Sequence, residues 1–353
     1  MQVLALIESA DHVCFRYRLN AHAWALAERN LFLEGAGLRR SVWARMAQFL
    51  AVRRADVVIL QRKLLPQWQL SALRRLTKHL IYDVDDALFH RDSYSPKGAR
   101  SRIRLARFRA TVRAADAVIT GNDYLREYSA AHADPRRVYV VPTCVQPTWY
   151  RPATHQRSGS AVRLTWIGQR SMLPSLDCLR PQFAAVARHL PNLELRLISD
   201  AAPVLPGLRV ELRPWSSATE ADELADADIG ISWLPDDLWS LGKCGLKVLQ
   251  YMAAGLPVVA NPVGIHRRMV IDGETGFLAS SPAQWATAIA CLAADPDLRN
   301  RMGAAARRAV QSRYNAERWG PRLAAIVDAV ARGRPARTQV ESTAPLAYVS
   351  GFD

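Results

Sequence analysis

The chain has 353 residues, of which 50% are hydrophobic, and this length exceeds what one hydrophobic core usually organises, so we expect two domains. Its five cysteines are scattered and form neither a C-x-x-C pair nor a cluster with histidine, which indicates reduced thiols in a cytoplasmic protein. The N-terminal residues lack the basic segment of a signal peptide, and no apolar run approaches the length of a membrane span, so we expect a soluble or peripheral protein.

The net charge of +15 is concentrated in one half of the chain. Residues 1–155 carry an excess of +12, whereas the remainder carries +3. A basic half indicates an anionic partner, which would be nucleic acid, a phospholipid surface, or an acceptor that bears phosphate or carboxylate. The alternative is the arginine-rich composition that a GC-rich genome produces.

The first half of the chain alternates apolar strands with amphipathic helices, the pattern of a parallel doubly wound sheet. In chain order we expect a strand at 2–7, a helix through 19–27, an amphipathic helix at 37–54, a strand at 55–62, a helix at 70–78, a strand at 80–82, a helix at 98–114, a strand and a helix within 115–130, and a strand from 138 onward. The last strand leaves through three prolines, so we place the end of the first domain at residue 155.

Two groups of arginines in this half have more than one interpretation. Arg16 and Arg18 follow the first strand, and because ligands gather at the carboxyl ends of strands in an open parallel sheet, both are candidates for binding an acceptor. A surface arginine pair is the alternative. Six arginines flank the apolar stripe of the helix at 98–114, a pattern that suits an anionic membrane, although we favour ordinary packing on a sheet.

A polar stretch at 153–161 has the composition of a linker, and the alternation of strands and helices then restarts in a second domain at 160–312. We expect a strand that ends at Gly168, a helix at 179–189, strands at 193–198 and 210–212, a helix at 220–225 and a strand at 228–233. A final helix follows at 313–333. Residues 334–353 lack periodicity, so we expect a mobile tail.

The stretch from Trp239 to Asn261 reads as a loop, a helix, a turn and a strand. Apolar residues recur at helical spacing between Leu246 and Ala253. Gly255 occupies the place of a left-handed residue after the helix, and a proline two positions later blocks continuation. The sequence therefore predicts a short, well-delimited helix.

Glycines and lysines crowd the start of this helix. Lys243 and Lys247 would bring two ammonium groups to one helix N-terminus, where free backbone N–H groups also point, and this arrangement suits a phosphate or pyrophosphate. The alternative is that both lysines are solvated and that Gly242 and Gly245 only shape a tight loop.

The stretch GKCGLKVLQYMAAGLPVV resembles the donor-site helix of glycosyltransferase family 4, retaining enzymes of the GT-B fold. The resemblance is to a subgroup with the pattern GKCGLKxLQYMAxGxPVV, and it covers residues 163–325 well and the first half more loosely. It implies an α/β protein of two Rossmann-like domains that face a cleft, with the donor nucleotide-sugar bound by residues 160–312 and the acceptor by residues 1–155. It also implies that the helix at 313–333 returns to the first domain.

The resemblance further implies which residues hold the donor. Gly168 would let the backbone approach the phosphates, and Arg170, Lys243 and Lys247 would neutralise the pyrophosphate. The family usually has two glutamates eight positions apart, and those places are Gly242 and Gln250 here. A glutamine still exchanges hydrogen bonds with a ribose hydroxyl, so we expect Gln250 to bind the donor, whereas the loss of the first glutamate leaves the sugar contact open.

Three aspartates follow the strand at 80–82. Asp83, Asp85 and Asp86 spell the D-x-D by which GT-A glycosyltransferases hold a divalent metal, but a GT-A enzyme would not carry the second-half resemblance. We therefore expect Asp85 or Asp86 to orient an acceptor hydroxyl or a basic side chain, with a structural role as helix cap and arginine partner as the alternative. His90 is a further candidate catalytic residue.

Other chemistries lack their motifs: no G-x-S-x-G and no G-x-G-x-x-G are present. We therefore expect a retaining, metal-independent glycosyltransferase that moves a sugar from a nucleotide-diphosphate donor to a hydroxyl of a lipid-linked or cell-surface glycan. It would need no cofactor, bind an anionic acceptor and an anionic membrane at the inner face of the cell membrane, and bind no nucleic acid. The alternative is a GT-B-like protein that has lost catalysis and binds a nucleotide-sugar or glycan.

Overall fold

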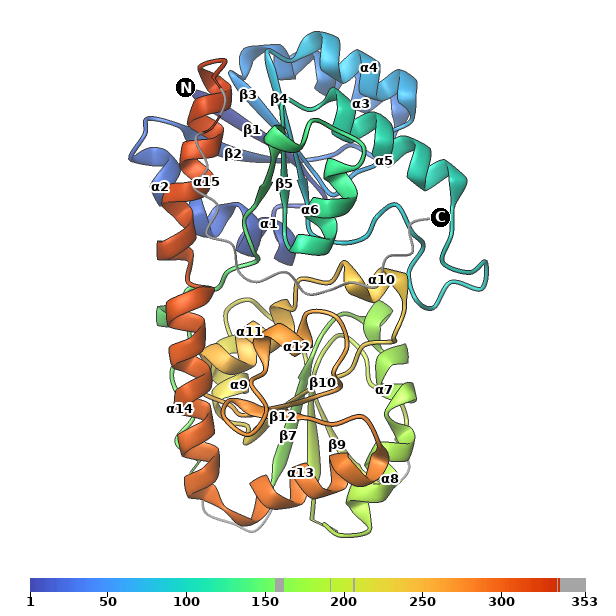
Figure 1. Ribbon diagram of the computed structural model, residues 1–353, viewed down its shortest axis with the longest axis vertical. Helices are drawn as coiled ribbons and strands as arrows, with labels where there is room; N and C mark the ends of the chain where they lie inside the picture. The colour runs from blue at the N-terminus through green and yellow to red at the C-terminus, as the bar shows by residue number, and fades with distance from the viewer. Residues whose placement is uncertain (156–161, 191, 206, 335, 337–353) are drawn as a thin grey trace. The chain divides into compact units, whose positions relative to one another are not determined.

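The computed structural model describes residues 1–155, 162–190, 192–205, 207–334 and 336, and the chain divides into two compact units (Figure 1). Unit 1 consists of Met1–Thr143, the short segment Leu241–Cys244 and the C-terminal helix from Ala316. Unit 2 consists of Cys144–Ser240 and Gly245–Asn315.

These units depart from the predicted domain boundaries. Unit 1 ends at Thr143 rather than at residue 155, because the next residues pair within unit 2: the Val145 N–H donates to the Tyr314 carbonyl at 3.0 Å. Unit 1 also takes in Leu241–Cys244, which lies within the sequence predicted as the second domain. Most of the predicted linker and tail falls at 156–161 and 337–353, outside the described residues.

Unit 1 is built on a six-stranded parallel sheet in the order β2-β1-β3-β4-β5-β6. Its strands are β1 (Gln2–Ile7), β2 (Phe32–Gly37), β3 (Val57–Gln61), β4 (His79–Val84), β5 (Ala117–Thr120) and β6 (Val138–Val140). The run VVILQ of β3 is buried along its whole length, as expected of a central strand that helices cover on both faces. The predicted doubly wound parallel sheet is confirmed.

Helices cover both faces of this sheet (Figure 1). Because parallel strands join through right-handed crossovers, the helices after β1 lie on one face and those after β2 to β5 on the other. The first group is α1 (Val13–Arg18) and α2 (Ala23–Ala27), and α15 (Ala316–Ala331) packs beside α2. The second group is α3 (Val42–Ala51), α4 (Gln67–Leu76), α5 (Arg102–Ala114) and α6 (Asp123–Ala130). The core of the α15 face joins Val57 and Ile59 to Leu323 and Val327.

Strand β2 corrects the sequence analysis, which missed it and began a helix at Gly37. The helix begins at Val42, and Gly37 is the last residue of the strand. The segment FLEGAG shows no clear alternation and has two glycines, but it pairs with β1 along six residues. Gly35 is needed there, because a Cβ would lie 2.6 Å from the Cζ atom of Phe15. Tertiary pairing thus outweighs a weak local preference.

Unit 2 has a second six-stranded parallel sheet, in the order β12-β11-β10-β7-β8-β9. Its strands are β7 (Arg163–Ile167), β8 (Glu194–Ile198), β9 (Arg209–Arg213), β10 (Ile229–Ser232), β11 (Val258–Ala260) and β12 (Gly276–Leu278). This order is that of nucleotide-binding α/β sheets, in which the ligand lies where the strand order reverses, here at the carboxyl ends of β7 and β10.

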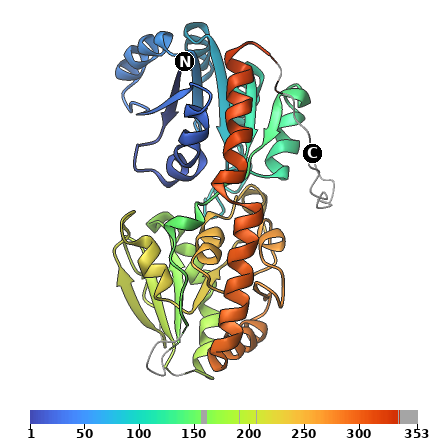
Figure 2. The same ribbon diagram turned by 90° about the vertical axis from the view of Figure 1, so that its left-hand side faces the viewer.

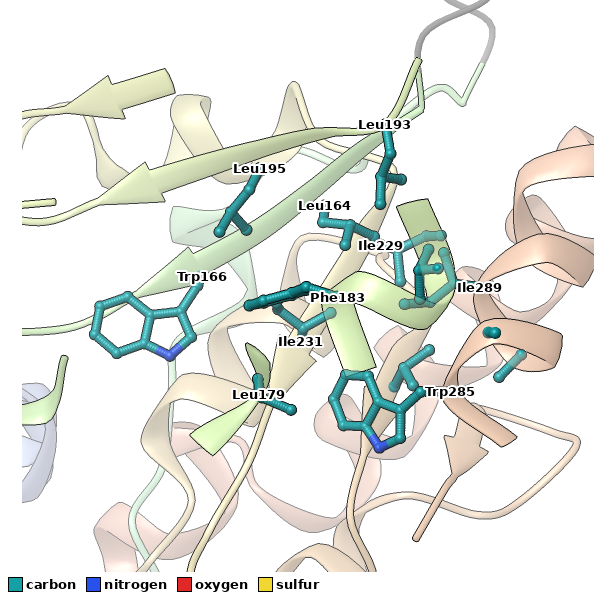
Figure 3. Packing of buried hydrophobic residues seen from close by; sticks show 14 of the residues in the cluster. Leu164, Trp166, Leu179, Phe183, Leu193, Leu195, Ile229, Ile231, Trp285 and Ile289 are labelled. Atoms are coloured by element: carbon teal, nitrogen blue, oxygen red, sulfur yellow. The ribbon is translucent and has the colours of Figure 1, made fainter. Parts of the chain in front are cut away.

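The hydrophobic core of unit 2 includes residues of this sheet and of two helices that pack against it. Figure 3 shows Trp166 of β7 together with Phe183 and Trp285, which come from α8 (Arg180–Ala187) and α13 (Pro282–Ala294). The buried Trp285 indole donates its N–H to the Ala279 carbonyl at 2.8 Å, so its polar atom is satisfied. The other helices are α7 (Pro174–Cys178), α9 (Glu220–Ala225), α10 (Leu238–Leu241), α11 (Leu246–Ala253), α12 (His266–Met269) and α14 (Pro296–Arg313).

The view in Figure 2 shows α14 and α15 as two long helices at the C-terminal end of the chain. Helix α14 belongs to unit 2 and α15 to unit 1. Among the residues that the structure describes, no helix combines the length and the apolar character that crossing a bilayer requires.

Candidate functional site

Helix α11 is anchored at both ends by glycines in the left-handed conformation. Gly245 precedes it with φ at 69°, and a Cβ there would lie 2.4 Å from the Met269 sulfur. Gly255 follows it, also with φ at 69°, as the sequence predicts. The Tyr251 hydroxyl accepts the backbone N–H of Ile167 at 3.0 Å, so α11 is tied to the end of β7.

Two of the predicted donor-binding residues lie against the same aromatic ring. The Nζ atom of Lys247 lies 3.7 Å from the ring centre of Trp166, a cation–π contact with a fully buried indole. A Cβ on Gly168 would lie 2.6 Å from the Cη2 atom of the same indole, so the backbone passes closely over it. The end of β7 and the start of α11 therefore form one surface with a cation at the switch point of the sheet.

Arg170 and Gln250 complete the predicted donor set in unit 2. Arg170 is largely exposed, its backbone N–H donates to the Asp200 carboxylate at 2.9 Å, and its guanidinium lies 3.6 Å from the same group. A surface pair of this kind contributes little, so the guanidinium can turn to an incoming anion at small cost. Gln250 is buried within α11.

The segment Leu241–Cys244 is seated on the loops that follow β4 and β5 in unit 1. The Asn122 side-chain amide donates to the Leu241 carbonyl at 3.2 Å and to the Lys243 carbonyl at 3.0 Å. Its oxygen accepts the Leu125 N–H at 2.9 Å and thereby caps α6, which fixes the direction of the amide. The Cys244 thiol lies 3.1 Å from the Asp85 carbonyl.

Glycine at position 242 has a steric reason. A Cβ there would lie 2.5 Å from the backbone nitrogen and 2.6 Å from the Cβ of Ala87. Gly242 stands where the family pattern has its first glutamate. Because Ala87 packs so closely against it, a larger side chain at this position requires the Ala87 loop to shift.

The two lysines of this stretch belong to different units and contact different groups. The Lys243 Nζ lies 3.1 Å from a carboxylate oxygen of Asp86, whereas Lys247 lies over Trp166.

Arg18 is placed differently from its prediction as an acceptor-binding residue. Its side chain is buried, its Nη2 atom donates to Asp83 at 2.5 Å, and its Nη1 atom donates to the Val141 carbonyl at 2.5 Å. Gln61 donates to the same carboxylate at 3.0 Å. A guanidinium with these partners and no exposed surface is a structural ion pair, so the prediction for Arg18 is wrong. Arg16 is half-buried, with its guanidinium 5.1 Å from the Tyr17 ring centre.

Asp85 and Asp86 are held together by Arg62, which the sequence analysis did not single out. Its guanidinium donates to one oxygen of each carboxylate at 2.6 Å. Burial alone raises the pKa of Asp85, but the charges of Arg62 and Arg18 outweigh it and hold the pKa below its ordinary value. Arg62 has φ at 56°, a conformation uncommon for a side chain of this size. Both carboxylates are therefore held in a fixed direction by the same guanidinium.

The three aspartates of the D-x-D stretch all have basic partners in this structure. Asp83 pairs with Arg18, Asp85 with Arg62, and Asp86 with Arg62 and Lys243. In the described part of the chain no three His, Cys, Asp or Glu side chains are grouped as metal ligands. The two sheets are also not those of a GT-A enzyme, on which that interpretation depended.

His90 lies in an aromatic cluster beside the acidic loop. Its ring packs edge-on against Phe89, with centroids 4.7 Å apart, and its Nε2 atom lies 3.5 Å from the Tyr124 hydroxyl. Phe89 in turn stacks on Tyr128 at 3.7 Å. His90 follows Asp86 by four residues in the same loop, and its side chain is buried.

A buried serine–histidine pair near the switch point also escaped the sequence analysis. The Ser232 hydroxyl at the end of β10 lies 3.0 Å from the His266 Nε2, and the His266 Nδ1 lies 3.0 Å from the Asn261 carbonyl. Burial lowers the pKa of His266 to about 4, so the imidazole is neutral. A serine at a strand end and a histidine more than thirty positions later give no sequence signal. The same holds for Trp166, which reads as an ordinary core residue.

Comparison with known proteins agrees with this architecture. Residues 157–295 match the family model of glycosyl transferases group 1. Over 204 residues the chain is 28% identical to a D-inositol 3-phosphate glycosyltransferase of Corynebacterium kroppenstedtii, covering 48% of this chain and 44% of the relative. Over 234 residues it is 31% identical to that of Streptomyces scabiei, covering 55% and 50%. The chain thus spans about half the length of the curated relatives it matches.

Solved structures match nearly the whole chain. The HepE protein of Anabaena in complex with UDP and glucose superposes with a TM-score of 0.69 at 15% identity, covering 92% of this chain and 98% of that one. WaaG, described as a glycosyltransferase involved in lipopolysaccharide biosynthesis, superposes with a TM-score of 0.68 at 16% identity, covering 93% and 99%. The chain therefore has the two-domain, Rossmann-like GT-B fold, and residues 157–295 of its second half are similar to the glycosyl transferases group 1 model.

Proposed function

We propose that the protein is a retaining glycosyltransferase that moves a sugar from a nucleotide-diphosphate donor to a hydroxyl of a lipid-linked or cell-surface glycan. The observation that carries the proposal is the surface at the end of β7 and the start of α11. Gly168 and Lys247 meet there over Trp166, at the strand end where parallel α/β sheets bind nucleotides.

Charge stabilisation is the central chemical demand of this reaction. As the sugar leaves, the diphosphate gains negative charge and the anomeric carbon becomes cationic, so fixed cations at the phosphates lower the barrier. Lys247 is held in place by the indole, and Arg170 is free to turn from its surface pair with Asp200. Lys243 would join them only by exchanging Asp86 for a phosphate. Gln250 would bind the ribose.

The acidic loop of unit 1 is the proposed place of the acceptor. Arg62 orients the carboxylates of Asp85 and Asp86 and holds the pKa of Asp85 below its ordinary value, so these groups can accept a hydrogen bond from a hydroxyl. His90 and Arg16 are the neighbouring candidates for acceptor contacts. The basic charge of residues 1–155 favours an anionic acceptor, and D-inositol 3-phosphate, named in the matched relatives, is one that bears a phosphate.

The experiment is a screen of nucleoside diphosphate sugars for thermal stabilisation, followed by measurement of nucleoside diphosphate release. A ligand at a hundred times its dissociation constant should stabilise the fold by about 2.7 kcal/mol. We expect turnover to continue in EDTA, since lysine and arginine would supply the positive charge. Loss of turnover in EDTA that only Mn²⁺ restores would contradict a metal-independent reaction.

A second candidate is a protein of the same fold that binds a nucleotide-sugar or glycan without transferring it. The specific observation in its favour is Gly242, whose packing against Ala87 leaves no room for the glutamate that the family pattern has there. Thermal stabilisation by a nucleotide-sugar without release of diphosphate, in the presence of acceptors, would support this function over the first.

A further inference from the structure

Helices α3, α4 and α5 form a neighbouring group on one face of unit 1, and five large apolar side chains on them are exposed, four of them by more than half. Trp43 is 85% exposed, Leu50 60%, Trp68 55% and Ile103 66%. Trp43 and Leu50 are seven positions apart, so they share one stripe of α3, and the buried Phe49 lies about 100° around the helix from Leu50. Helix α4 contacts both α3 and α5, so the four side chains belong to one helical layer.

Helices α3, α4 and α5 contain no acidic residue, and a single aspartate, Asp56 or Asp116, stands between α3 or α5 and the strand that follows. Residues 38–54, 62–78 and 100–115 together hold sixteen lysines and arginines and no aspartate or glutamate. Some of these cations are structural: Arg45 ties α3 to α4 through the Gln69 side chain at 2.9 Å, and Arg74 pairs with Asp116 at 3.1 Å. Others are exposed, and within the described residues Arg39, Arg40, Arg53 and Arg54 form no ion pair through their side chains.

We propose that this layer, named here the α3–α5 face, docks on a bilayer that contains anionic phospholipid. Tryptophan, leucine and isoleucine side chains gain by entering the boundary between headgroups and acyl chains, and arginines around them gain from lipid phosphates. The proposal deepens the proposed function and rests on it for its biological purpose, since a lipid-linked acceptor would be presented at such a surface.

The combination of side chains distinguishes a bilayer from other anionic partners. A nucleic acid satisfies arginines and stacks on tryptophan, but it offers nothing to exposed Leu50 and Ile103. Each Lys or Arg near an anionic membrane contributes about 1 kcal/mol, and this attraction is screened within a Debye length of roughly 8 Å at physiological salt.

The test is co-sedimentation of the full chain with vesicles of equal parts phosphatidylcholine and phosphatidylglycerol, compared with pure phosphatidylcholine. We expect binding to the mixed vesicles at low salt that weakens steeply as salt rises. Arg53→Gln with Arg54→Gln should lower the partition coefficient roughly tenfold to thirtyfold. Trp43→Ser with Leu50→Ser should lower the partition coefficient several-fold, and the binding that remains should be abolished by salt.

Matched controls lie in unit 2. Val204 is 81% exposed, close to the 85% of Trp43, and Arg301 and Arg308 are exposed residues of α14 in unit 2. Val204→Ser, and Arg301→Gln with Arg308→Gln, should sediment as the unaltered protein does. If these controls lose binding as strongly as the α3–α5 variants, the attraction is a property of the total charge and the proposal is overturned.

Insertion is distinguished from adsorption by fluorescence. Vesicles with brominated acyl chains should quench part of the tryptophan emission, and Trp43→Phe with Trp68→Phe should remove most of that quenching while sedimentation persists. Binding to RNA or heparin without binding to mixed vesicles would overturn the proposal. Thermal stabilisation by nucleotide-sugars is measured separately. If the protein binds mixed vesicles but no nucleotide-sugar stabilises it, the result counts against the proposed function alone. If a nucleotide-sugar stabilises it but it does not bind mixed vesicles, the result counts against the α3–α5 face alone.

Discussion

The ammonium group of Lys247 lies 3.7 Å from the centre of the Trp166 ring, and the indole is fully buried beneath it. A cation held over an aromatic face in this way is attracted by about 0.5–2 kcal/mol. The flexible lysine stem is thereby fixed before any ligand arrives. Trp166 thus acts as a positioning residue for the cation that we assign to the donor phosphates.

The first prediction concerns this pair. Trp166→Leu should weaken the binding of UDP or GDP, whichever the screen selects, roughly twofold to thirtyfold, because the cation–π attraction is lost. Trp166→Phe keeps an aromatic face and is the matched variant, with a smaller loss. Isothermal titration measures both, and circular dichroism checks the fold, since either change also removes volume from the core. Equal losses in the two variants would show that packing, not the ring face, is responsible.

The second prediction separates the two lysines of the GKCGLK stretch. Lys247→Ala should weaken nucleoside diphosphate binding about tenfold to a hundredfold, the range expected for a lost charge-assisted hydrogen bond. Lys243→Ala removes a cation that lies on Asp86, so its effect on affinity should be smaller. The measurement is titration with the diphosphate. A normally folded Lys247→Ala variant with unchanged affinity would remove Lys247 from the phosphate site.

The third prediction concerns the hydrogen bonds from Asn122 that hold the segment Leu241–Cys244. Asn122→Asp keeps the cap oxygen of α6 but places a carboxylate against the Leu241 and Lys243 carbonyls, which the amide now satisfies. We expect a loss of about 1–3 kcal/mol in unfolding free energy, measured by urea denaturation. Asn122→Ser retains a capping oxygen and a donor and should lose less. If the aspartate variant is as stable as the serine variant, the two carbonyl contacts contribute little.

The fourth prediction is a pH dependence of stability set by His266. Burial, the first cause, holds the pKa of this histidine at about 4, below the ordinary value of 6.5. Between these values the unfolded chain binds a proton that the folded chain excludes, so the unfolding free energy falls as pH falls through this window, by up to about 3 kcal/mol. His266→Gln should be less stable than the unaltered protein at neutral pH. The gap should narrow from pH 6.5 toward 4, because glutamine does not titrate.

A second buried histidine, His22 of unit 1, serves as the control for this experiment. Burial also lowers the pKa of His22 to about 4, so part of the acid sensitivity should remain in the His266→Gln variant. Guanidinium denaturation across the window measures both curves. Two parallel curves, with a constant difference at every pH, would mean that His266 does not titrate with folding.

Strand and helix periods identified most elements from the sequence because they reflect local physics. The buried run VVILQ and the interval from Leu246 to Gly255 are readable because apolar spacing and left-handed glycines are properties of short segments. Strand β2 was missed for the opposite reason: an exposed edge segment with two glycines is a strand only because β1 lies beside it.

Site residues divide in the same way. The glycine and lysine pattern singled out Gly168 and Lys247, whereas the partner that unites them, Trp166, reads as core. Arg18 reads as an exposed arginine near a strand end, yet it is buried against Asp83, sixty-five positions later. Pairs of this kind carry no local pattern, since only the packing of distant segments brings the charges together.

By itself the sequence determined two repeating α/β halves, a glycine-bounded helix with a cation at its start, and the basic excess of residues 1–155, because period, turn chemistry and charge are carried by neighbouring residues. Only the tertiary structure decided which unit holds Leu241–Cys244, which carboxylate each of Arg18, Arg62 and Lys243 neutralises, and which apolar side chains stay exposed on α3 to α5. The reason is physical: burial and ion pairing depend on which surfaces of distant segments come into contact, and no local preference specifies that.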